Sequence, residues 1–324
     1  MGITWSQFFP PRPTLTEANL PSQKGKVFLV TGGYSGVGYE LCAILYQAGG
    51  KVYLAGRSST KARDAIRSIE ALSTKSTGGQ IAFLQLALDD LETIKPAAEK
   101  FLSTESRLDV LFNNAGVSNP PKGSISKQGY ELQMATNCLG HHLLTQLLLP
   151  VLKNTAKITS PSSVRVIWTS SIIVDLSAPK GGINLSDLSN PPSDQQKNYD
   201  TSKVGNWFLA HSLAGQLGSE GILSVTANPG NLNTPLLRHM PRYVEIITRP
   251  LLYGPNMGAY TELWAGLSDD VKMSDGGKYV LPWGQLHPYP REDILQAMKD
   301  EAEGGTGVAD EFVKWCDAQI ADFR

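Results

Sequence analysis

The sequence predicts an α/β protein built on a doubly wound parallel sheet with helices on both faces. Three observations support this fold class. Apolar runs of strand length alternate with stretches of helical periodicity through most of the chain. The first run ends in a glycine-rich turn, and polar residues follow the later runs. Regular alternation favours a parallel sheet, and right-handed crossovers between its strands place helices on both faces.

The expected elements follow from short apolar runs for strands and from 3.6-residue periodicity for helices. Gly49 and Gly50 end the first helix, Pro96 lies near the start of the third, and Gly140 marks a bend in the fourth. The expected strands are 27–31, 51–55, 81–86, 110–112, 164–169 and 223–227, and the expected helices are 36–48, 59–72, 90–102, 130–152 and 199–217.

The domain organisation is expected to be simple, with one large domain and no internal repeat. Residues 1–25 are expected to form a proline-rich N-terminal extension, and residues 26–290 the main domain. Within that domain, residues 175–198 are rich in Pro, Gly, Ser and Asn and lack periodicity, which predicts a substrate-contacting loop. Residues 291–324 form a short appendage with two helices, over 291–303 and 308–320.

Composition excludes several classes of protein. The 324 residues are 41% hydrophobic, enough for a substantial core, and the net charge of −1 gives no reason to expect nucleic acid as a partner. Three scattered cysteines favour a reducing compartment, which suggests a cytoplasmic location. The five histidines lack metal-ligand spacing. No apolar run approaches the roughly 18 residues of a transmembrane helix; peripheral membrane attachment and a homo-oligomer stay open.

A glycine-rich turn joins the first expected strand to the first helix. Its glycines are Gly32, Gly36 and Gly38, and Tyr34 occupies the place that a second glycine takes in the common GxGxxG form. A dinucleotide pyrophosphate needs such a turn, because the backbone must approach closely and the helix N-terminus must face the phosphates. By itself a glycine-rich strand–helix turn is often only a turn.

The end of the second expected strand bears on the choice of cofactor. An NAD enzyme places a carboxylate there to hold the ribose hydroxyls, whereas this chain has Gly56, Arg57 and Ser58. Arg57 could pair with a 2′-phosphate and Ser58 could add a hydroxyl, which predicts NADP(H). The alternative is a solvated arginine at a strand end.

Tyr199 and Lys203 open the last expected helix of the main domain at i and i+4, on one helical face. A tyrosine has a pKa near ~10, and a neighbouring cation lowers that pKa, so the phenol could exchange a proton with a substrate oxygen. The bare pattern is common by chance. It gains weight because Ser170 and Ser171 follow a strand that ends at the same edge of the sheet.

Taken together, these motifs resemble the short-chain dehydrogenase/reductase family over residues 25 to 280, which implies a Rossmann-like fold. The segment from Asn137 to Thr145 is most similar to the retinol-dehydrogenase-like branch, and residues 9–11 and 277–284 resemble fungal members, many of which serve secondary metabolism. The matching motifs are TGxxxGxG at 31–38, NNAG at 113–116, Asn137, Ser171, Tyr199 with Lys203, and PGxxxT at 229–234.

The resemblance implies a role for each matched residue. Tyr199 would be the general acid/base, Lys203 would lower its pKa and hold the nicotinamide ribose, and Ser171 would orient the substrate oxygen, with Ser170 as the alternative. Asn137 would position a water molecule. The implied cofactor-binding residues are Gly32, Tyr34, Ser35, Gly36, Val37, Gly38, Arg57, Ser58, Asn113, Ala115, Gly116, Tyr199, Lys203, Pro229, Gly230, Leu232 and Thr234.

One position departs from the family pattern. Ala87 stands where the family often has an aspartate that contacts the adenine, so this contact would be missing unless Asp89 or a backbone group replaces it. The expected function is hydride transfer between NADP(H) and a carbonyl/alcohol pair on an apolar small molecule. The alternatives are an NAD-linked alcohol dehydrogenase and a dinucleotide-binding redox sensor without turnover.

Overall fold

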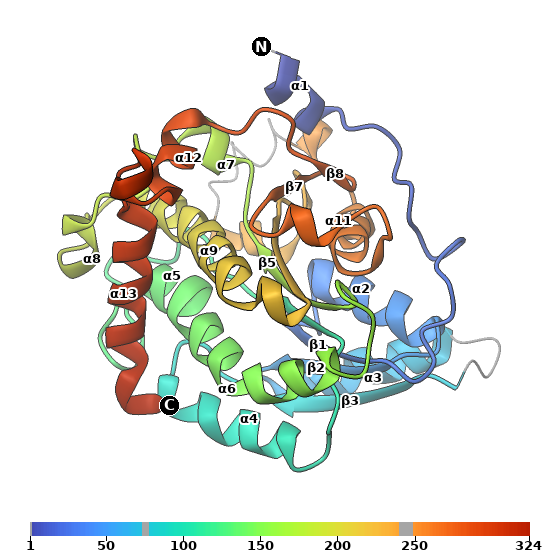
Figure 1. The fold of residues 1–324 in the computed structure, drawn as a ribbon. Helices are drawn as coiled ribbons and strands as arrows, with labels where there is room; N and C mark the ends of the chain where they lie inside the picture. Colours follow the sequence, from blue (N-terminus) through green and yellow to red (C-terminus); the bar gives the residue numbers. More distant parts are fainter. Residues whose placement is uncertain (1, 73–77, 240–248) are drawn as a thin grey trace.

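The computed structural model describes residues 2–72, 78–239 and 249–324, and within them the strands form one sheet (Figure 1). Its order is β3-β2-β1-β4-β5-β6-β7-β8, parallel except for the antiparallel β7–β8 pair. The predicted doubly wound sheet is therefore confirmed. The strands are β1 (Val27–Thr31), β2 (Lys51–Gly56), β3 (Gln80–Gln85), β4 (Val110–Asn113), β5 (Val164–Thr169), β6 (Ile222–Ala227), β7 (Tyr279–Leu281) and β8 (Gln285–Leu286).

Helices cover both faces of this sheet, as expected. Every residue of β1, β4, β5 and β6 is buried, which explains why these strands read as continuous apolar runs without alternation. One core packs under α2 (Gly36–Gln47), α3 (Ser59–Leu72) and α11 (Pro255–Leu267). The other packs under α4 (Ile94–Leu102), α6 (Gly140–Ala156), α9 (Gln195–Leu217) and α13 (Val308–Ile320).

The helix that carries Tyr199 begins earlier than the sequence predicted. It starts at Gln195, because the Asp194 carboxylate caps it by accepting hydrogen bonds from the backbone N–H groups of Gln196 and Lys197. Two short helices, α7 (Ile173–Leu176) and α8 (Ser186–Ser189), also lie in this region. The expectation of an irregular loop over 175–198 was therefore wrong at both ends and at 186–189.

The expected helix over 130–152 is divided into three pieces. It comprises α5 (Leu132–Met134), a π-helical segment (Ala135–Leu139) and α6. Gly140 follows the π-helical segment, and a Cβ atom there would lie 2.4 Å from the carbonyl oxygen of Leu88. Glycine at this position therefore allows the helix to approach the chain that follows β3.

The C-terminal residues share the core of one face. Phe312 and Cys316 of α13 are fully buried, and the Phe312 ring lies 6.2 Å from that of Phe208 in α9. Figure 1 shows α13 alongside α9. The expected helix over 291–303 is shorter, with α12 at Glu292–Met298. The remaining helices are α1 (Gly2–Phe8) and 3-10 turns at Leu91–Thr93, Gly218–Glu220, Pro235–His239, Arg249–Leu251, Met273–Asp275, Glu301–Glu303 and Ala321–Phe323.

A membrane-spanning helix is absent from the part of the chain that the structure describes, since none of its helices is both long and apolar enough.

Candidate active site

A cavity with a volume of about 760 Å³ lies at the carboxyl ends of β1, β4, β5 and β6. Ligands bind at this edge in open α/β sheets, because loops diverge there and leave a crevice. Its wall includes the glycine turn, Arg57, residues 114–119 after β4, residues 169–173 after β5, Tyr199 and Lys203 of α9, and residues 229–232 after β6.

Tyr199 and Lys203 line this cavity together. The Lys203 Nζ lies 5.6 Å from the centre of the Tyr199 ring and donates a hydrogen bond of 3.0 Å to the carbonyl oxygen of Thr169. Both side chains are buried. The i, i+4 spacing on one helical turn thus brings the phenol and the ammonium group to one site.

Burial dominates the electrostatics of this pair. It raises the pKa of Tyr199 to about 12, against the opposing hydrogen bonds with Ser171 and Ser118. It lowers the pKa of Lys203 to about 8. The sequence predicted that the lysine lowers the pKa of the tyrosine, but in this structure desolvation of the phenolate is the larger effect. The phenol is therefore protonated at neutral pH.

The two serines after β5 have different surroundings. Ser170 donates a 2.7 Å hydrogen bond to the carbonyl oxygen of Lys203, which ties the strand end to α9. Ser171 hydrogen-bonds the Tyr199 side chain, and its carbonyl oxygen accepts a 2.7 Å hydrogen bond from Tyr279. The geometry therefore favours Ser171 over Ser170 as the residue that faces a substrate oxygen.

Asn137 is fully buried and lies behind the cavity wall. Its Oδ1 accepts a hydrogen bond from the Val117 N–H at 2.9 Å, and its Nδ2 donates to the Val117 carbonyl oxygen at 3.1 Å and to Ser202 Oγ at 2.9 Å. These contacts clamp the loop after β4 to α9. The role of Asn137 in positioning a water molecule stays a prediction.

The glycine turn packs closely against the loop after β4. A Cβ atom on Gly38 would lie 2.6 Å from Asn114 Nδ2, and Asn114 donates a 2.7 Å hydrogen bond to the Thr31 carbonyl oxygen. Gly32 and Gly36 have φ angles of +69° and +54°, a region that glycine adopts without steric cost. Gly38 thus acts through packing and is not part of the cavity wall, whereas Gly32, Tyr34, Ser35, Gly36 and Val37 line it.

Arg57 forms an ion pair with Asp89 at the cavity wall. Its Nη1 lies 2.6 Å from the Asp89 Oδ2, with 57% of the arginine and 24% of the aspartate side chain exposed. Ser58 lies outside the wall, and its hydroxyl accepts a hydrogen bond from the Lys61 N–H. The expected contact of Ser58 with the cofactor stays a prediction.

The loops after β4 and β6 supply the rest of the expected cofactor residues. Ala115, Gly116, Pro229, Gly230, Leu232 and Thr234 all line the cavity. Asn113 does not, because its side chain turns into the core and donates a 2.9 Å hydrogen bond to Thr145 Oγ1. Asn231, which the sequence analysis passed over, also lines the cavity and has a buried Nδ2 with no hydrogen-bond partner among the described residues.

Sequence reasoning missed three further residues of the site. Ser118 follows the NNAG motif by two positions and contacts Tyr199, a proximity that the motif could have signalled. Tyr279 lies in β7, a three-residue strand too short to be recognised. Phe8 lines the cavity from α1, about 190 residues before Tyr199, and no local pattern links the two.

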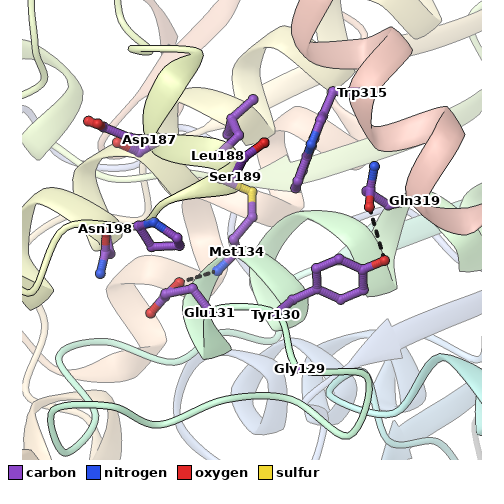
Figure 2. A pocket seen from close by; sticks show the side chains of 12 residues that line it. Gly129, Tyr130, Glu131, Met134, Asp187, Leu188, Ser189, Asn198, Trp315 and Gln319 are labelled. Atoms are coloured by element: carbon purple, nitrogen blue, oxygen red, sulfur yellow. Dashed lines mark hydrogen bonds between the residues drawn. The ribbon is translucent and has the colours of Figure 1, made fainter.

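A second cavity, of about 300 Å³, lies between α5, α9 and α13 (Figure 2). Tyr130 donates a 3.0 Å hydrogen bond to Gln319 across it, and Glu131 caps α5 by accepting from the Met134 N–H at 2.7 Å. None of the candidate catalytic residues lines it. Within the described residues there is also no group of three or more His, Cys, Asp or Glu that could hold a metal ion.

Comparison with known proteins identifies the family of this chain. A family model described as short chain dehydrogenase matches residues 26–243. The chain is 44% identical over 317 residues to short-chain dehydrogenase/reductase iacJ of Pestalotiopsis fici, across 97% of this chain and 96% of that protein. It is 45% identical over 325 residues to a short-chain dehydrogenase/reductase of Phomopsis amygdali, with coverages of 98% and 96%.

Solved structures show the same fold. An uncharacterized protein from Mycobacterium Paratuberculosis has a TM-score of 0.68 and 27% identity, covering 95% of this chain and 97% of that one. RhlG of Pseudomonas aeruginosa, solved as a complex with NADP, has a TM-score of 0.58 and 26% identity, with coverages of 74% and 88%. By the family match and by its relatives, this chain belongs to the short-chain dehydrogenase/reductase family of oxidoreductases.

Proposed function

We propose that this oxidoreductase transfers hydride between NADP(H) and a carbonyl/alcohol pair on an apolar small molecule, with Tyr199 as the acid/base. The observation that carries the proposal is the convergence of Tyr199, Ser171 and Lys203 in one cavity with the glycine turn and Arg57. The nicotinamide ring, when bound, supplies or takes up the hydride. The protein then has to position the substrate and manage one proton.

The protonated phenol of Tyr199 is suited to donating that proton to a carbonyl oxygen, which favours reduction over oxidation. Ser171, which hydrogen-bonds the phenol, would hold the same oxygen, so the substrate is oriented by two hydroxyl groups. Lys203, held by the Thr169 carbonyl oxygen, would contact the ribose of the cofactor with its remaining N–H donors. Asn137 would keep the loop after β4 in place behind these groups.

The residues of the cavity fit a nicotinamide dinucleotide. A Cβ atom at Gly32 would lie 3.1 Å from the Ala115 Cα, and the φ angle of +69° would strain any side chain there, so glycine keeps this part of the cavity open for a pyrophosphate. The unpartnered Nδ2 of Asn231 is a donor of the kind that a carboxamide oxygen accepts.

Preference for NADP(H) rests on Arg57. A guanidinium group has five N–H donors, and Asp89 engages Nη1, which leaves donors for a 2′-phosphate. The rival, an NAD-linked alcohol dehydrogenase, draws support from Asp89 itself, since its carboxylate lines the same wall and could accept hydrogen bonds from a ribose.

The substrate is expected to be largely apolar because aliphatic residues from the loops after β5 and β6 form much of the cavity wall. These are Ile172, Ile173, Leu236, Leu237, Leu251 and Leu252. Resemblance to the retinol-dehydrogenase-like branch agrees with such a substrate and stays a prediction. The relatives from Pestalotiopsis fici and Phomopsis amygdali favour a setting in fungal secondary metabolism. The buried, unpaired Cys42, Cys138 and Cys316 favour a cytoplasmic location.

Turnover of a panel of aldehydes and ketones with NADPH and with NADH tests the proposal. NADPH should also raise the melting temperature, since a ligand at a hundredfold excess over its Kd stabilises the folded state by about 2.7 kcal/mol. Binding without turnover of any carbonyl would favour the redox-sensor alternative. Equal or tighter binding of NADH would overturn the NADP(H) assignment.

A further inference from the structure

The N-terminal helix α1 lies beside the cavity, although the sequence separates it from the other residues of the site. Figure 1 shows α1 at the edge of the molecule near α7 and β8. Phe8 forms part of the cavity wall. The neighbouring Phe9 and Trp5 are exposed, and their rings contact each other in a tilted arrangement with centres 4.5 Å apart. Phe8 and Phe9 are thus adjacent in the sequence, but Phe8 lines the cavity whereas Phe9 is exposed to solvent.

Gln7 anchors this segment to α7 and to the turn that follows β6. Its side chain is 1% exposed. The Nε2 donates a 2.7 Å hydrogen bond to Asp175 Oδ2, and the Oε1 accepts a 2.8 Å hydrogen bond from Asn228 Nδ2. A buried primary amide that uses both its oxygen and its nitrogen fixes the distance between its partners.

Both partners of Gln7 lie within two positions of residues that line the cavity. Asp175 lies in α7, which follows Ser171, and its carboxylate also contacts His287 Nε2 at 3.0 Å. Asn228 precedes Pro229, and its Oδ1 accepts a 3.0 Å hydrogen bond from the Gly230 N–H. Gln7 therefore joins the substrate side of the cavity to the turn after β6.

A third anchor holds Phe8 over the aliphatic part of the cavity. Its carbonyl oxygen accepts a 3.0 Å hydrogen bond from the Tyr253 hydroxyl, and Tyr253 follows Leu251 and Leu252 of the wall. The Tyr253 ring packs edge-on against Trp283 at 5.0 Å, which in turn occupies the space beside Gly230. Phe8 is thus held beside the part of the chain that contributes Leu251 and Leu252 to the cavity wall.

We propose that Phe8 is a specificity-determining residue that contacts the apolar part of the substrate, and that Gln7 is a positioning residue for α7 and the turn at 228–230. This inference rests on the proposed function, because it assigns the substrate to the aliphatic end of the same cavity. It makes the N-terminal segment part of the active site.

The matched pair Phe8→Ala and Phe9→Ala, in the full-length chain, tests the role of Phe8. Reduction by NADPH is measured for 2-butanone, 2-octanone and 2-tridecanone. Phe8→Ala should lower kcat/KM for 2-tridecanone about tenfold relative to 2-butanone, because only a long chain reaches the missing ring. Phe9→Ala should leave this ratio unchanged within twofold. Equal ratios in the two variants would overturn the assignment.

Binding of the dye 8-anilinonaphthalene-1-sulfonate, displaced by 2-tridecanone, provides a readout that needs no turnover. Phe8→Ala should weaken the dye about fivefold, and Phe9→Ala should not. If no ketone is reduced but Phe8→Ala still weakens the dye more than Phe9→Ala does, the proposed reaction is wrong and the placement of Phe8 in the cavity wall is supported. If reduction is normal and neither ratio nor dye affinity changes, the wall assignment is wrong. Phe8→Leu, which keeps an apolar side chain, should give intermediate values.

Hydrogen exchange tests the role of Gln7 independently of activity. Gln7→Leu should speed exchange about tenfold at 172–178 and at 228–232, with α13 unchanged as the internal reference. Gln7→Glu retains an acceptor for Asn228 but opposes the Asp175 carboxylate, so it should loosen 172–178 more than 228–232. Unaltered exchange in both segments would show that Gln7 positions neither loop. Trp5→Ala, which removes an exposed ring, is the control.

Discussion

Lys203 and Glu262 are connected through a single residue, Thr169. Lys203 Nζ donates to the Thr169 carbonyl oxygen at 3.0 Å, and the Thr169 hydroxyl donates to Glu262 Oε1 at 2.7 Å. Glu262 comes from α11, on the opposite face of the sheet from α9, and is fully buried. Burial raises its pKa to about 7, although the hydrogen bond from Thr169 and the charge of Lys203 oppose the shift.

Glu262→Gln should therefore change how stability depends on pH. The folded pKa of about 7 exceeds the unfolded value of 4.5, so this group stabilises the fold below pH 4.5 and loses that contribution as pH rises through 7. An amide cannot ionise. Between pH 5 and pH 7.5 the free energy of unfolding of Glu262→Gln should rise relative to the unaltered chain by roughly 2 kcal/mol. Urea unfolding at several pH values measures this difference. The same dependence of the unfolding free energy on pH in both proteins would contradict the prediction.

Tyr199→Phe should abolish turnover while the fold is kept. The substitution removes the exchangeable proton but retains the buried ring, so kcat should fall by ~10²–10⁴-fold. The Kd of NADPH should change little, because the hydroxyl acts on the substrate oxygen. Steady-state kinetics and cofactor fluorescence measure the two effects. A folded variant with near-normal turnover would show that another group handles the proton.

Lys203→Ala should differ from Tyr199→Phe because the lysine is assigned two roles. Both turnover and NADPH affinity should fall, and the ionisation that controls the rate should move to higher pH as the phenol loses its neighbouring cation. A pH–rate profile and a titration of NADPH measure these changes, with melting temperatures to exclude unfolding. Unchanged NADPH binding would separate the lysine from the cofactor.

Substitution of Arg57 and Asp89 should have opposite effects on cofactor choice. Arg57→Ala should weaken NADPH by roughly 1.5–3 kcal/mol and leave NADH nearly unchanged, because only NADPH carries the 2′-phosphate. Asp89→Asn removes a negative charge 2.6 Å from the guanidinium and should tighten NADPH selectively. Dissociation constants at fixed ionic strength test both. An equal loss for the two cofactors in Arg57→Ala would exclude a phosphate contact.

The segment 175–198 should be protected unevenly, because Arg291 holds only its beginning. The guanidinium donates to the carbonyl oxygens of Val174, Ala178 and Pro179 at 2.8–3.1 Å. Arg291→Ala should speed hydrogen exchange and proteolysis at 174–182 and leave 186–194 as it was. Lys314→Ala, which breaks an exposed ion pair on α13, is the control. Equal exchange along 174–194 in the unaltered chain would contradict this prediction.

Short-range signals made most of the fold predictable. Local sequence identifies the strands β1 and β5 by their apolar runs, and the turn after β1 by Gly32 and Gly36. Tyr199 and Lys203 are one helical turn apart, so their proximity also follows from local sequence. The contacts that could not be predicted join distant parts of the chain. Gln7 and Phe8 are held at the cavity by hydrogen bonds with residues more than 160 positions away, and β7 is too short to show a periodic pattern.

Motifs also left the orientation of side chains open. Asn113 and Asn114 are adjacent in the sequence, yet one turns into the core toward Thr145 and the other crosses to the Thr31 carbonyl oxygen. Neighbouring residues at a strand end point to opposite sides, and the sequence does not show which side faces the cavity. Ser170 and Ser171 were left open for the same reason, and the structure separates them by their partners.

The packing of Tyr34 on Gly56 couples the end of β2 to the glycine turn. A Cβ atom on Gly56 would lie 2.2 Å from the Tyr34 ring, so a side chain at position 56 requires that ring to move. An acidic residue there, as in NAD enzymes, would therefore displace a side chain that lines the same cavity as Arg57. A substitution at position 56 that changes the cofactor contact is thus also a change in the surroundings of the turn at 32–38.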